Sequence, residues 1–479
     1  MPNKSAKAAH QEFDVVVVGA GPAGVACAVR SAQLGFTTAC IDNWSDEHGQ
    51  SSLGGAFLNA GTVATLALLE SAKLFYTLQH DINKHGIQAE QITVDIPKLI
   101  KRKDNIVESL RKNAADLFKK HHIKLIHGKA KLCNERLIEV SSVENLSVSR
   151  VEAKHIVLAT GSLPCQLACA PTDNDTILDS ATALNIQSLP RRLAIIGAGV
   201  IGLELASIWN RLGSKITLLE AQDTFLNLPD HIISREAYRI FSAQGLDLRL
   251  GARVIATKKT SQGITVEYLT NEGPQTLHAD KLIVATGRKP NTEGLAAPEA
   301  NLLLDENGYV HVDNNCRTNL PGVYAIGDIT VLGPMLAHKG MEEGVFVAEQ
   351  IADTHNPINF DRLPSVIFTD PEIAWVGQTE QALRAVGEPI KIGTYFLRDT
   401  AKALTLGKSD GLVKIISHSE SDTILGVHII GPQAAELIAE AVLAMEFSAS
   451  SEDLVRTIHA YPTLSEGLHH AAQTIVNSK

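Results

Sequence analysis

The sequence contains the same strand–turn–helix–strand unit twice, and this repeat constrains the fold more than any other feature. In the first copy, the apolar run at 13–18 leads directly into Gly19-Ala-Gly21-Pro-Ala-Gly24, and the next apolar run ends at Asp42. At this spacing, the first glycine permits a tight turn, the second lets a pyrophosphate approach the backbone, and the third permits close helix–strand packing. The helix N-terminus presents free N–H groups to phosphates. The unit therefore predicts a dinucleotide site, with Asp42 placed to bind a ribose.

The second copy begins at the apolar run 193–196 and has the same spacing. Gly197-Ala-Gly199-Val-Ile-Gly202 follows this run, and the later strand ends at Glu220, which has the same offset from Gly197 as Asp42 has from Gly19. Two complete units predict two bound dinucleotides. A nicotinamide and a flavin that face each other would make a hydride-transfer enzyme.

Glu220 also predicts which nicotinamide cofactor the second unit binds. A carboxylate at this position favours a free ribose 2′-hydroxyl and repels a 2′-phosphate. No arginine occurs in the following segment, 221–227, to receive such a phosphate. We therefore expect NAD(H) rather than NADP(H).

Two further strand-plus-glycine segments are near copies of each other. One ends at Thr160-Gly161 and the other at Thr286-Gly287, and a third apolar strand ends at Gly327-Asp328. Towards the C-terminus the pattern changes to short strands typical of an antiparallel sheet and one amphipathic helix. The expected fold is α/β, with two Rossmann-like dinucleotide-binding domains and a C-terminal α+β dimerisation domain. The expected domains are 12–165 (FAD, first part), 166–287 (NAD), 288–355 (FAD, return part) and 356–479 (interface).

Composition excludes several other classes of protein. Lys and Arg total 43 against 53 Asp and Glu, and the resulting net charge of −10 does not favour a nucleic-acid partner. No apolar stretch reaches the roughly 18 residues that a membrane span needs. The polar N-terminus lacks the apolar core of a signal peptide, so we expect a cytoplasmic protein. Six cysteines in 479 residues do not make a disulfide scaffold, and we expect no metal site.

The order of these segments resembles the flavin-dependent pyridine nucleotide–disulfide oxidoreductases, most closely the dihydrolipoamide dehydrogenases. The resemblance covers residues 12–475 and rests on motifs such as VVVVGAGPAG, LGGAFLNAG, ATGSLP, LAIIGAGVIGLELA, VATGRKPNTEGL, GVYAIGD, MLAHKGMEEG and HAYPTLSE. It implies FAD in the first unit, NAD(H) in the second, and a homodimer. It also implies that Asp328 holds the ribityl side of the flavin, and that Glu204 lies beside the nicotinamide–flavin contact.

The sequence departs from the family at four positions. The family stretch GGTCxNxGCxPSK supplies a redox disulfide and a lysine near the flavin, but here Phe57 and Thr62 stand at the two cysteines and Leu66 at the lysine. In the family's C-terminal HxHPTxxE, the second histidine is the general base. Tyr461 stands at that histidine here, whereas Glu466 matches the carboxylate partner of the base.

These departures all remove groups that the family's disulfide chemistry needs. Disulfide exchange requires a thiolate and a second sulfur, which neither Phe nor Thr supplies. A tyrosine, with a usual pKa near 10, cycles a proton at neutral pH far less readily than a histidine. Glu204 would also lose its expected ionic partner, so we expect its pKa to rise. The candidate catalytic residues are therefore Glu204, Thr62, Tyr461 and Glu466 in a degenerate site, and Thr62 and Tyr461 alternatively form a new pair of substrate-binding hydroxyls.

The sequence leaves three functions open. The first is hydride transfer from NADH to FAD and then to a small-molecule acceptor that is not a disulfide, such as a quinone, a dye, oxygen or a second nicotinamide. The second is a pseudoenzyme that binds FAD and NAD without catalysis. The third is dihydrolipoyl dehydrogenase activity through an unusual relay, against which the sequence argues.

Overall fold

The structure, a computed structural model, describes residues 10–45, 49, 51–142, 147–354 and 359–478. Contacts divide it into two compact units, and each is described by itself. The first unit comprises the described parts of Met1–Ala64, Lys101–Cys165 and Arg288–Phe360, and the second those of Thr65–Ile100, Gln166–Gly287 and Asp361–Lys479. The four-domain division of the sequence stays a prediction. Its 355/356 boundary and its last residue, Lys479, lie outside the described residues.

The first unit is built on a seven-stranded sheet. Its order is β3-β2-β1-β6-β5-β4, and β17 pairs with β6. The strands are β1 (His10–Val18), β2 (Thr38–Asp42), β3 (Lys124–His127), β4 (Lys129–Leu132), β5 (Leu137–Ser141), β6 (Val148–Leu158) and β17 (Val323–Ala325).

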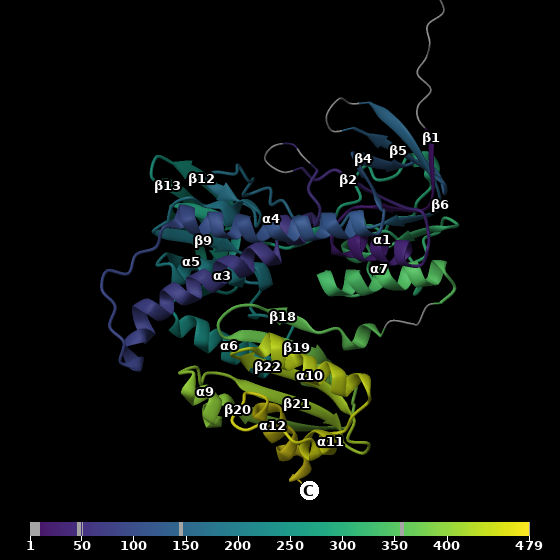
Figure 1. Cartoon of the computed structure of the whole chain (residues 1–479). Coiled ribbons are helices and arrows are strands. Elements are labelled where there is room, and N and C mark those ends of the chain that lie inside the picture. The colour runs from purple at the N-terminus through teal and green to yellow at the C-terminus, as the bar shows by residue number, and fades with distance from the viewer. Residues whose placement is uncertain (1–9, 46–48, 50, 143–146, 355–358, 479) are drawn as a thin grey trace, which may run out of the picture. The chain divides into compact units, whose positions relative to one another are not determined.

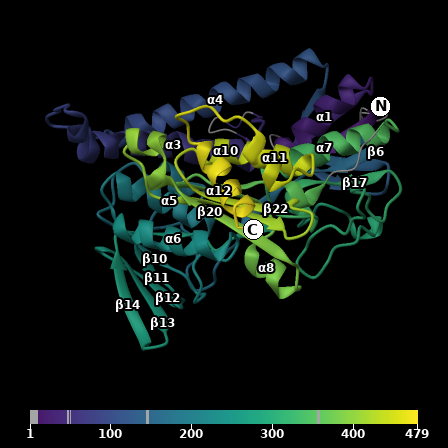
Figure 2. The same cartoon turned by 90° about the horizontal axis from the view of Figure 1, so that it is seen from below.

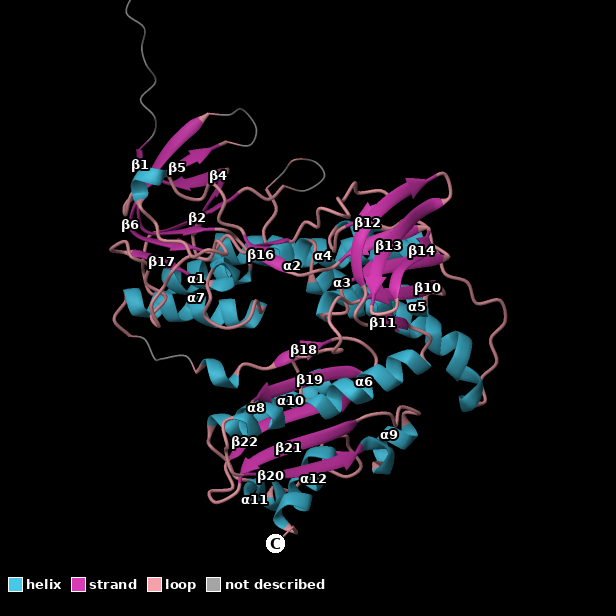
Figure 3. Ribbon diagram, turned by 180° about the vertical axis from the view of Figure 1, so that it is seen from behind, coloured by secondary structure: helices cyan, strands magenta, loops and turns pink. Residues whose placement is uncertain are grey.

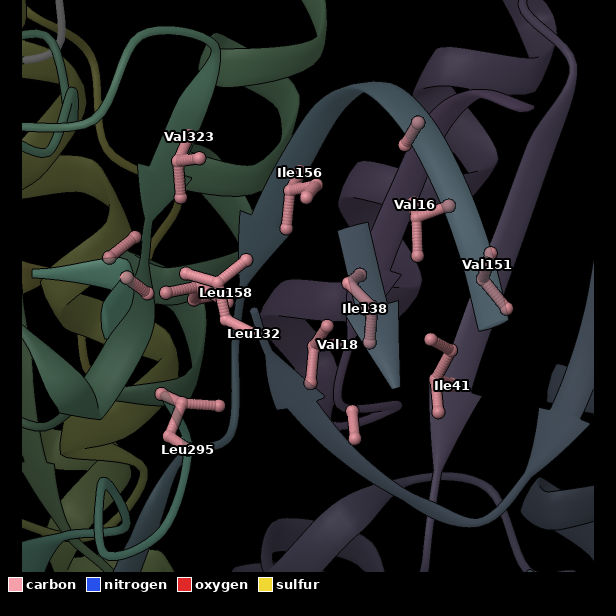
Figure 4. Close-up of a cluster of buried hydrophobic side chains, with 14 of the residues drawn as sticks. Val16, Val18, Ile41, Leu132, Ile138, Val151, Ile156, Leu158, Leu295 and Val323 are labelled. Atoms are coloured by element: carbon pink, nitrogen blue, oxygen red, sulfur yellow. The ribbon is translucent and has the colours of Figure 1, made fainter. Parts of the chain in front are cut away.

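The centre of this sheet is buried on both faces, as its apolar strands predict, because four consecutive residues are buried in β1 and four in β2. β1 pairs in parallel with β2 and β6, which is typical of strands that read as continuous Val- and Ile-rich runs. Val16, Val18 and Ile41 point into one apolar cluster with Ile138 and Val151 (Figure 4). This packed sheet fixes the turn that follows β1.

Two helices of the first unit lie side by side beneath the sheet, α1 (Pro22–Gln33) and α7 (Ala337–Ile351) (Figure 1). Gly344 permits their close approach, because a Cβ atom there would lie 2.5 Å from the carbonyl oxygen of Ala23. The helix α2 (Gly55–Asn59) follows the first nucleotide-binding segment. The helices α3 (Thr62–Tyr76) and α4 (Ile96–Lys120) contribute residues to both units.

The nucleotide-binding half of the second unit contains a five-stranded parallel sheet of order β11-β10-β9-β15-β8. Its strands are β8 (Ile177–Leu178), β9 (Arg192–Ile196), β10 (Lys215–Leu219), β11 (Asp247–Arg249) and β15 (Lys281–Val284). The helices are α5 (Val200–Arg211) and α6 (His231–Ala243). An antiparallel sheet of β12 (Arg253–Thr260), β13 (Gly263–Thr270) and β14 (Gly273–Ala279) completes this half (Figure 2).

The C-terminal half of the second unit is a five-stranded antiparallel sheet in the order β18-β19-β22-β21-β20 (Figure 3). Its strands are β18 (Ser365–Ile367), β19 (Glu372–Gly377), β20 (Ile390–Phe396), β21 (Leu412–His418) and β22 (Ile424–Gly431). The helices are α8 (Glu380–Ala385), α9 (Ala401–Thr405), α10 (Ala434–Glu446), α11 (Ser451–Arg456) and α12 (Glu466–Val476). The change from parallel to antiparallel pairing confirms the predicted α/β and α+β parts.

None of the helices in the described ranges combines the length and the apolar character that crossing a membrane requires.

Candidate functional site

The first predicted nucleotide site is the turn between β1 and α1. Gly19 has a φ of +109°, and Gly21 caps α1 in an extended conformation. A Cβ atom on Gly24 would lie 1.8 Å from the carbonyl oxygen of Gly19, so only glycine permits this packing. A Cβ atom on Gly21 would meet only the Cα of Gly55, at 4.0 Å. The helix N-terminus is therefore open to a phosphate group.

Asp42 ends β2 beside this turn. Its Oδ1 accepts hydrogen bonds from the amides of Asn43 and Trp44, at 2.9 and 3.4 Å. Its Oδ2 is buried and lacks a hydrogen-bond partner among the described residues. Burial raises the pKa of this carboxyl group, against the lowering effect of backbone N–H groups. A buried acceptor without a donor fits a ribose hydroxyl, and the site therefore fits a dinucleotide.

The second predicted nucleotide site repeats this geometry between β9 and α5. Gly197 has a φ of +99°, and a Cβ atom on Gly202 would lie 2.0 Å from its carbonyl oxygen. A Cβ atom on Gly199, which caps α5, would meet nothing within 4 Å. Glu220 accepts hydrogen bonds from the amides of Ala198 at 2.9 Å and Gln222 at 3.0 Å. The carboxylate is thus held at the end of β10, beside the glycine turn.

The two strand-plus-glycine segments end close to their respective glycine turns. A Cβ atom on Gly19 would lie 2.3 Å from the carbonyl oxygen of Ala159, and one on Gly197 would lie 2.5 Å from that of Ala285. Thr160 and Gly161 are therefore placed beside the first turn. Thr286 and Gly287 stand in the same relation to the second, and Gly287 has a φ of +112°.

Sequence reasoning did not single out the residues that hold the ends of these segments. The carbonyl oxygen of Asn291 accepts a hydrogen bond from Thr160 Oγ1 at 2.7 Å, and the Asn291 amide donates to the carbonyl oxygen of Gly161 at 2.9 Å. The strands β7 (Ser162–Pro164) and β16 (Arg288–Pro290), which follow the two strand-plus-glycine segments, pair in antiparallel fashion. The similarity of the two segments in sequence was the available signal, but it gave no pairing.

Asp328 lies in the short helix Gly327–Ile329 of the first unit and is half-buried. Ser162 Oγ donates a 2.5 Å hydrogen bond to its Oδ2, and Arg288 Nε donates to Ser162 Oγ at 2.7 Å. These two hydrogen bonds in series orient the Asp328 carboxylate. Ser162 and Arg288 were not predicted, because both are distant from Asp328 in the sequence and no local spacing relates them to it.

The residues at the family's cysteine and lysine positions lie on two helices, α2 and α3, that follow each other closely in the chain. Phe57 is in α2, Thr62 is the first residue of α3, and Leu66 lies one turn further along α3. All three side chains are half-buried. Asn59, between them, accepts a 2.6 Å hydrogen bond from Arg111 Nε of α4 and donates to the carbonyl oxygen of Gly55 at 2.9 Å. The stretch is therefore a fixed helix pair rather than a loop.

Glu204 lies on α5, beyond the Gly199 cap, and is only 5 % exposed. Its Oε1 accepts a hydrogen bond from the amide of Phe368 at 3.0 Å. Burial raises the pKa of this carboxyl group to about 7, and the Phe368 amide opposes the shift. The pKa shift of Glu204 has the predicted direction, and its largest cause is burial.

The C-terminal candidates lie between α11 and α12. Tyr461 is 76 % exposed. Glu466 is buried at the start of α12 and accepts a 2.8 Å hydrogen bond from the amide of Thr463. His459, at the family's other histidine, lies 2.6 Å from Glu440 Oε1 through Nε2 and 2.9 Å from the carbonyl oxygen of Thr457 through Nδ1. In the single chain, Glu466 thus holds its own loop, and Tyr461 faces outward.

Comparison with known proteins identifies the family. Residues 13–344 match the pyridine nucleotide-disulphide oxidoreductase family, and residues 363–472 match the dimerisation domain of the same family. The chain is 43 % identical over 472 residues to the dihydrolipoyl dehydrogenase of Cupriavidus necator, covering 97 % of this chain and 98 % of that one. The chain belongs to the pyridine nucleotide–disulfide oxidoreductase family.

Other members of this family show the same breadth of similarity. The leghemoglobin reductase of Vigna unguiculata is 36 % identical to this chain. The alignment covers 96 % of this chain and 87 % of that protein. The crystal structure of LpdA from Mycobacterium tuberculosis superposes with a TM-score of 0.87 at 26 % identity, over 97 % of this chain and 99 % of that one. Dihydrolipoyl dehydrogenases of this family use FAD and NAD(H), and both nucleotide sites described above fit these groups.

The described residues offer no alternative centre for a metal ion. Among them, no cluster of three or more His, Cys, Asp or Glu side chains has a geometry that could hold one.

The raised pKa of Glu204 predicts a pH dependence of stability that a glutamine variant removes. In the unfolded chain, the carboxyl ionises near its usual value of 4.5, whereas in the folded protein it stays protonated up to about pH 7. The protonated Glu204 carboxyl therefore contributes about 3 kcal/mol to the free energy of unfolding below pH 4.5. This contribution is lost as the pH rises to about 7. The melting temperature of the wild-type holoprotein should fall relative to Glu204→Gln across this range and then run parallel above it. Parallel melting curves throughout the range would contradict the raised pKa.

Proposed function

We propose that this protein is a FAD-dependent NADH oxidoreductase that delivers electrons to an acceptor other than a disulfide. The observation that carries the proposal is the pair Phe57 and Thr62 at the family's two cysteine positions. A phenyl ring and a hydroxyl cannot form or break a sulfur–sulfur bond, whatever their orientation. The leghemoglobin reductase among the relatives supports the idea that this architecture serves acceptors of other kinds.

The surroundings of the cysteines in this chain also argue against a substitute for the family's redox-active pair. All six cysteines are free. Cys27, Cys40 and Cys316 are buried, and burial raises the pKa of Cys27 to about 12 and that of the other two well above the usual range. Such thiols remain protonated at neutral pH and are poor nucleophiles. Cys169 lies in the second unit, where its Sγ donates to the carbonyl oxygen of Val254 at 3.5 Å.

The residues of the chain divide the work of holding the two cofactors. Gly19, Gly21 and Gly24 would admit the FAD pyrophosphate, with Asp42 at the ribose and Asp328 at the ribityl chain. Gly197, Gly199 and Gly202 would admit the NAD(H) pyrophosphate, with Glu220 at the ribose. When bound, FAD supplies the capacity to accept a hydride from NADH and to pass electrons onward.

Glu204 and Leu66 would give the flavin side of the site its electrostatic character. Leu66 contributes no charge where the family has a lysine, and Glu204, with a pKa raised to about 7, is largely neutral below that pH. We therefore assign Glu204 as the proton-holding group of the site, and Thr62 and Tyr461 as hydroxyls available to a polar acceptor.

A second copy of the chain is the expected macromolecular partner. The family's dimerisation domain covers residues 363–472. Large apolar side chains of this region are exposed in the single chain: Leu443 at 60 %, Phe447 at 78 % and Ile458 at 97 %. Exposed apolar groups of this size favour burial against a partner.

The test is anaerobic mixing of the purified yellow protein with NADH, followed by stopped-flow absorbance of the visible flavin band. We expect rapid bleaching, and then recovery of the band when a quinone, a dye or oxygen is added. Lipoamide should leave the bleached protein unchanged. Protein that carries FAD but does not bleach with NADH would instead be a pseudoenzyme, and protein that binds no flavin would refute the proposed function altogether.

A further inference from the structure

A buried ion pair lies on α7, one helical turn apart. Lys339 is 1 % exposed and Glu343 is fully buried, and the Lys339 Nζ lies 3.1 Å from Glu343 Oε1. Burying both charges carries a large desolvation cost, and apolar residues of similar volume are often equally stable or more stable at such positions. Stability alone therefore does not explain the pair.

Both members of the pair contact the backbone of one residue, Gly327, on its N–H and on its carbonyl oxygen. The Gly327 amide donates a 2.6 Å hydrogen bond to Glu343 Oε2, and Lys339 Nζ donates to the Gly327 carbonyl oxygen at 3.2 Å. Thr330 also donates to this carbonyl oxygen, through Oγ1 at 3.2 Å. The carbonyl oxygen of Gly327 thus has two side-chain donors, Lys339 and Thr330. The N–H of Gly327 is held by Glu343.

Gly327 also lies where three elements meet. Gly327 has a φ of +75°, and a Cβ atom on it would lie 3.4 Å from the Cβ of Ala23, in the first turn of α1. A Cβ atom on Gly340 of α7 would lie 3.0 Å from that same Ala23 atom and 3.3 Å from the Cα of Gly327. The next residue is Asp328, whose carboxylate is oriented by Ser162. The pair therefore fixes the backbone between the phosphate-binding end of α1 and the Asp328 carboxylate.

We propose that Lys339 and Glu343 are positioning residues for FAD, which act by fixing the backbone on both sides of Gly327 and hence the orientation of Asp328. This inference rests on the proposed assignment of Asp328 to the FAD site. Without the pair, the Gly327 amide loses its acceptor and the Gly327 carbonyl oxygen loses one donor, and the φ and ψ of Gly327 can change because a glycine has no Cβ to restrict them. Asp328 would then leave the orientation that its hydrogen bond from Ser162 selects.

The decisive variant is Lys339→Met/Glu343→Met, which removes both charges together and leaves neither one buried without a partner. We expect it to fold, and to bind FAD at least about tenfold more weakly than wild type, which corresponds to one lost hydrogen bond of the charge-assisted kind. The dissociation constant is measured from the fluorescence of flavin released on dilution of the holoprotein. The visible circular dichroism of the residual bound flavin should change as well, because its surroundings change.

Two further variants separate the peptide contact from other effects. Lys339→Met/Glu343→Gln keeps an oxygen acceptor for the Gly327 amide, and it should restore FAD affinity to within about threefold of wild type. Arg30→Met/Glu349→Gln removes the partly exposed ion pair between α1 and α7, at 2.6 Å, without touching Gly327. It should bind FAD like wild type. If the methionine variant does not fold, Lys339→Met/Glu343→Leu replaces it.

The outcomes distinguish this inference from the proposed function. Equal FAD affinity in the wild type and the methionine variant would overturn the positioning role and leave the proposed function intact. Equal losses in the methionine and glutamine variants would also overturn it, because the charge and not the peptide contact would then matter. A wild-type protein that binds no FAD would defeat the proposed function itself.

Discussion

The wild-type protein is expected to oxidise dihydrolipoamide with NAD⁺ at least about 10⁴-fold more slowly than it reduces a dye with NADH. The loss of a general base alone costs about 10²–10⁴ in rate, and the proposed function has no sulfur relay either. Both rates are measured as turnover numbers on the same preparation at neutral pH. Comparable rates in the two assays would refute the proposed acceptor class.

A restored variant provides the matched control for this result. Phe57→Cys/Thr62→Cys/Leu66→Lys/Tyr461→His returns the family residues to all four positions. We expect this variant to gain dihydrolipoamide turnover by at least about 100-fold, since nucleophile and base act as a unit. Phe57→Cys alone supplies one sulfur and should gain nothing. A gain from the single substitution would mean that another thiol of the chain already serves as the second sulfur.

Alanine at Gly199 should weaken NADH binding by about 100-fold or more, whereas the stability of the protein should stay within about 0.5 kcal/mol of wild type. Gly199 has an ordinary extended conformation, and a Cβ atom there meets nothing within 4 Å of the protein itself. The added methyl group would instead occupy the space through which the pyrophosphate approaches the start of α5. NADH affinity is measured by titration of the holoprotein, and stability by thermal unfolding.

Two other glycines serve as controls for Gly199→Ala. Gly202→Ala places a Cβ atom 2.0 Å from the Gly197 carbonyl oxygen, so it should destabilise the second unit by about 3 kcal/mol or more. Gly21→Ala is the equivalent of Gly199→Ala in the first unit, and it should weaken FAD binding instead of NADH binding. If Gly199→Ala leaves NADH affinity unchanged, the second unit does not bind a dinucleotide at this turn.

Local patterns in the sequence predicted a large part of the fold. Each glycine turn, the helix that follows it and the acidic residue at the next strand end are near neighbours in the sequence, so spacing alone relates them. The strands of the C-terminal sheet were predicted for the same reason, because alternation and apolar runs are local. The absence of cysteine at positions 57 and 62 is likewise a property of the sequence, although only the family resemblance gives it a meaning.

Contacts between distant segments could not be predicted in this way. Asp328 is oriented by Ser162 across 166 residues, and Thr160 contacts Asn291 across 131 residues. The two similar strand-plus-glycine segments were seen in the sequence, but the pairing of β7 with β16 brings together residues that are far apart in the chain. No local period records such a pairing.

The sequence by itself determined the two dinucleotide-binding folds, the expectation of NAD(H) and the residue types that stand at positions 57, 62, 66 and 461. Each of these depends on which residue types stand at a fixed spacing. Only the tertiary structure decided how deeply Glu204 is buried and what surrounds Lys339 and Glu343. Desolvation is a property of everything packed around a charge, and the chain brings those surroundings together only when it is folded.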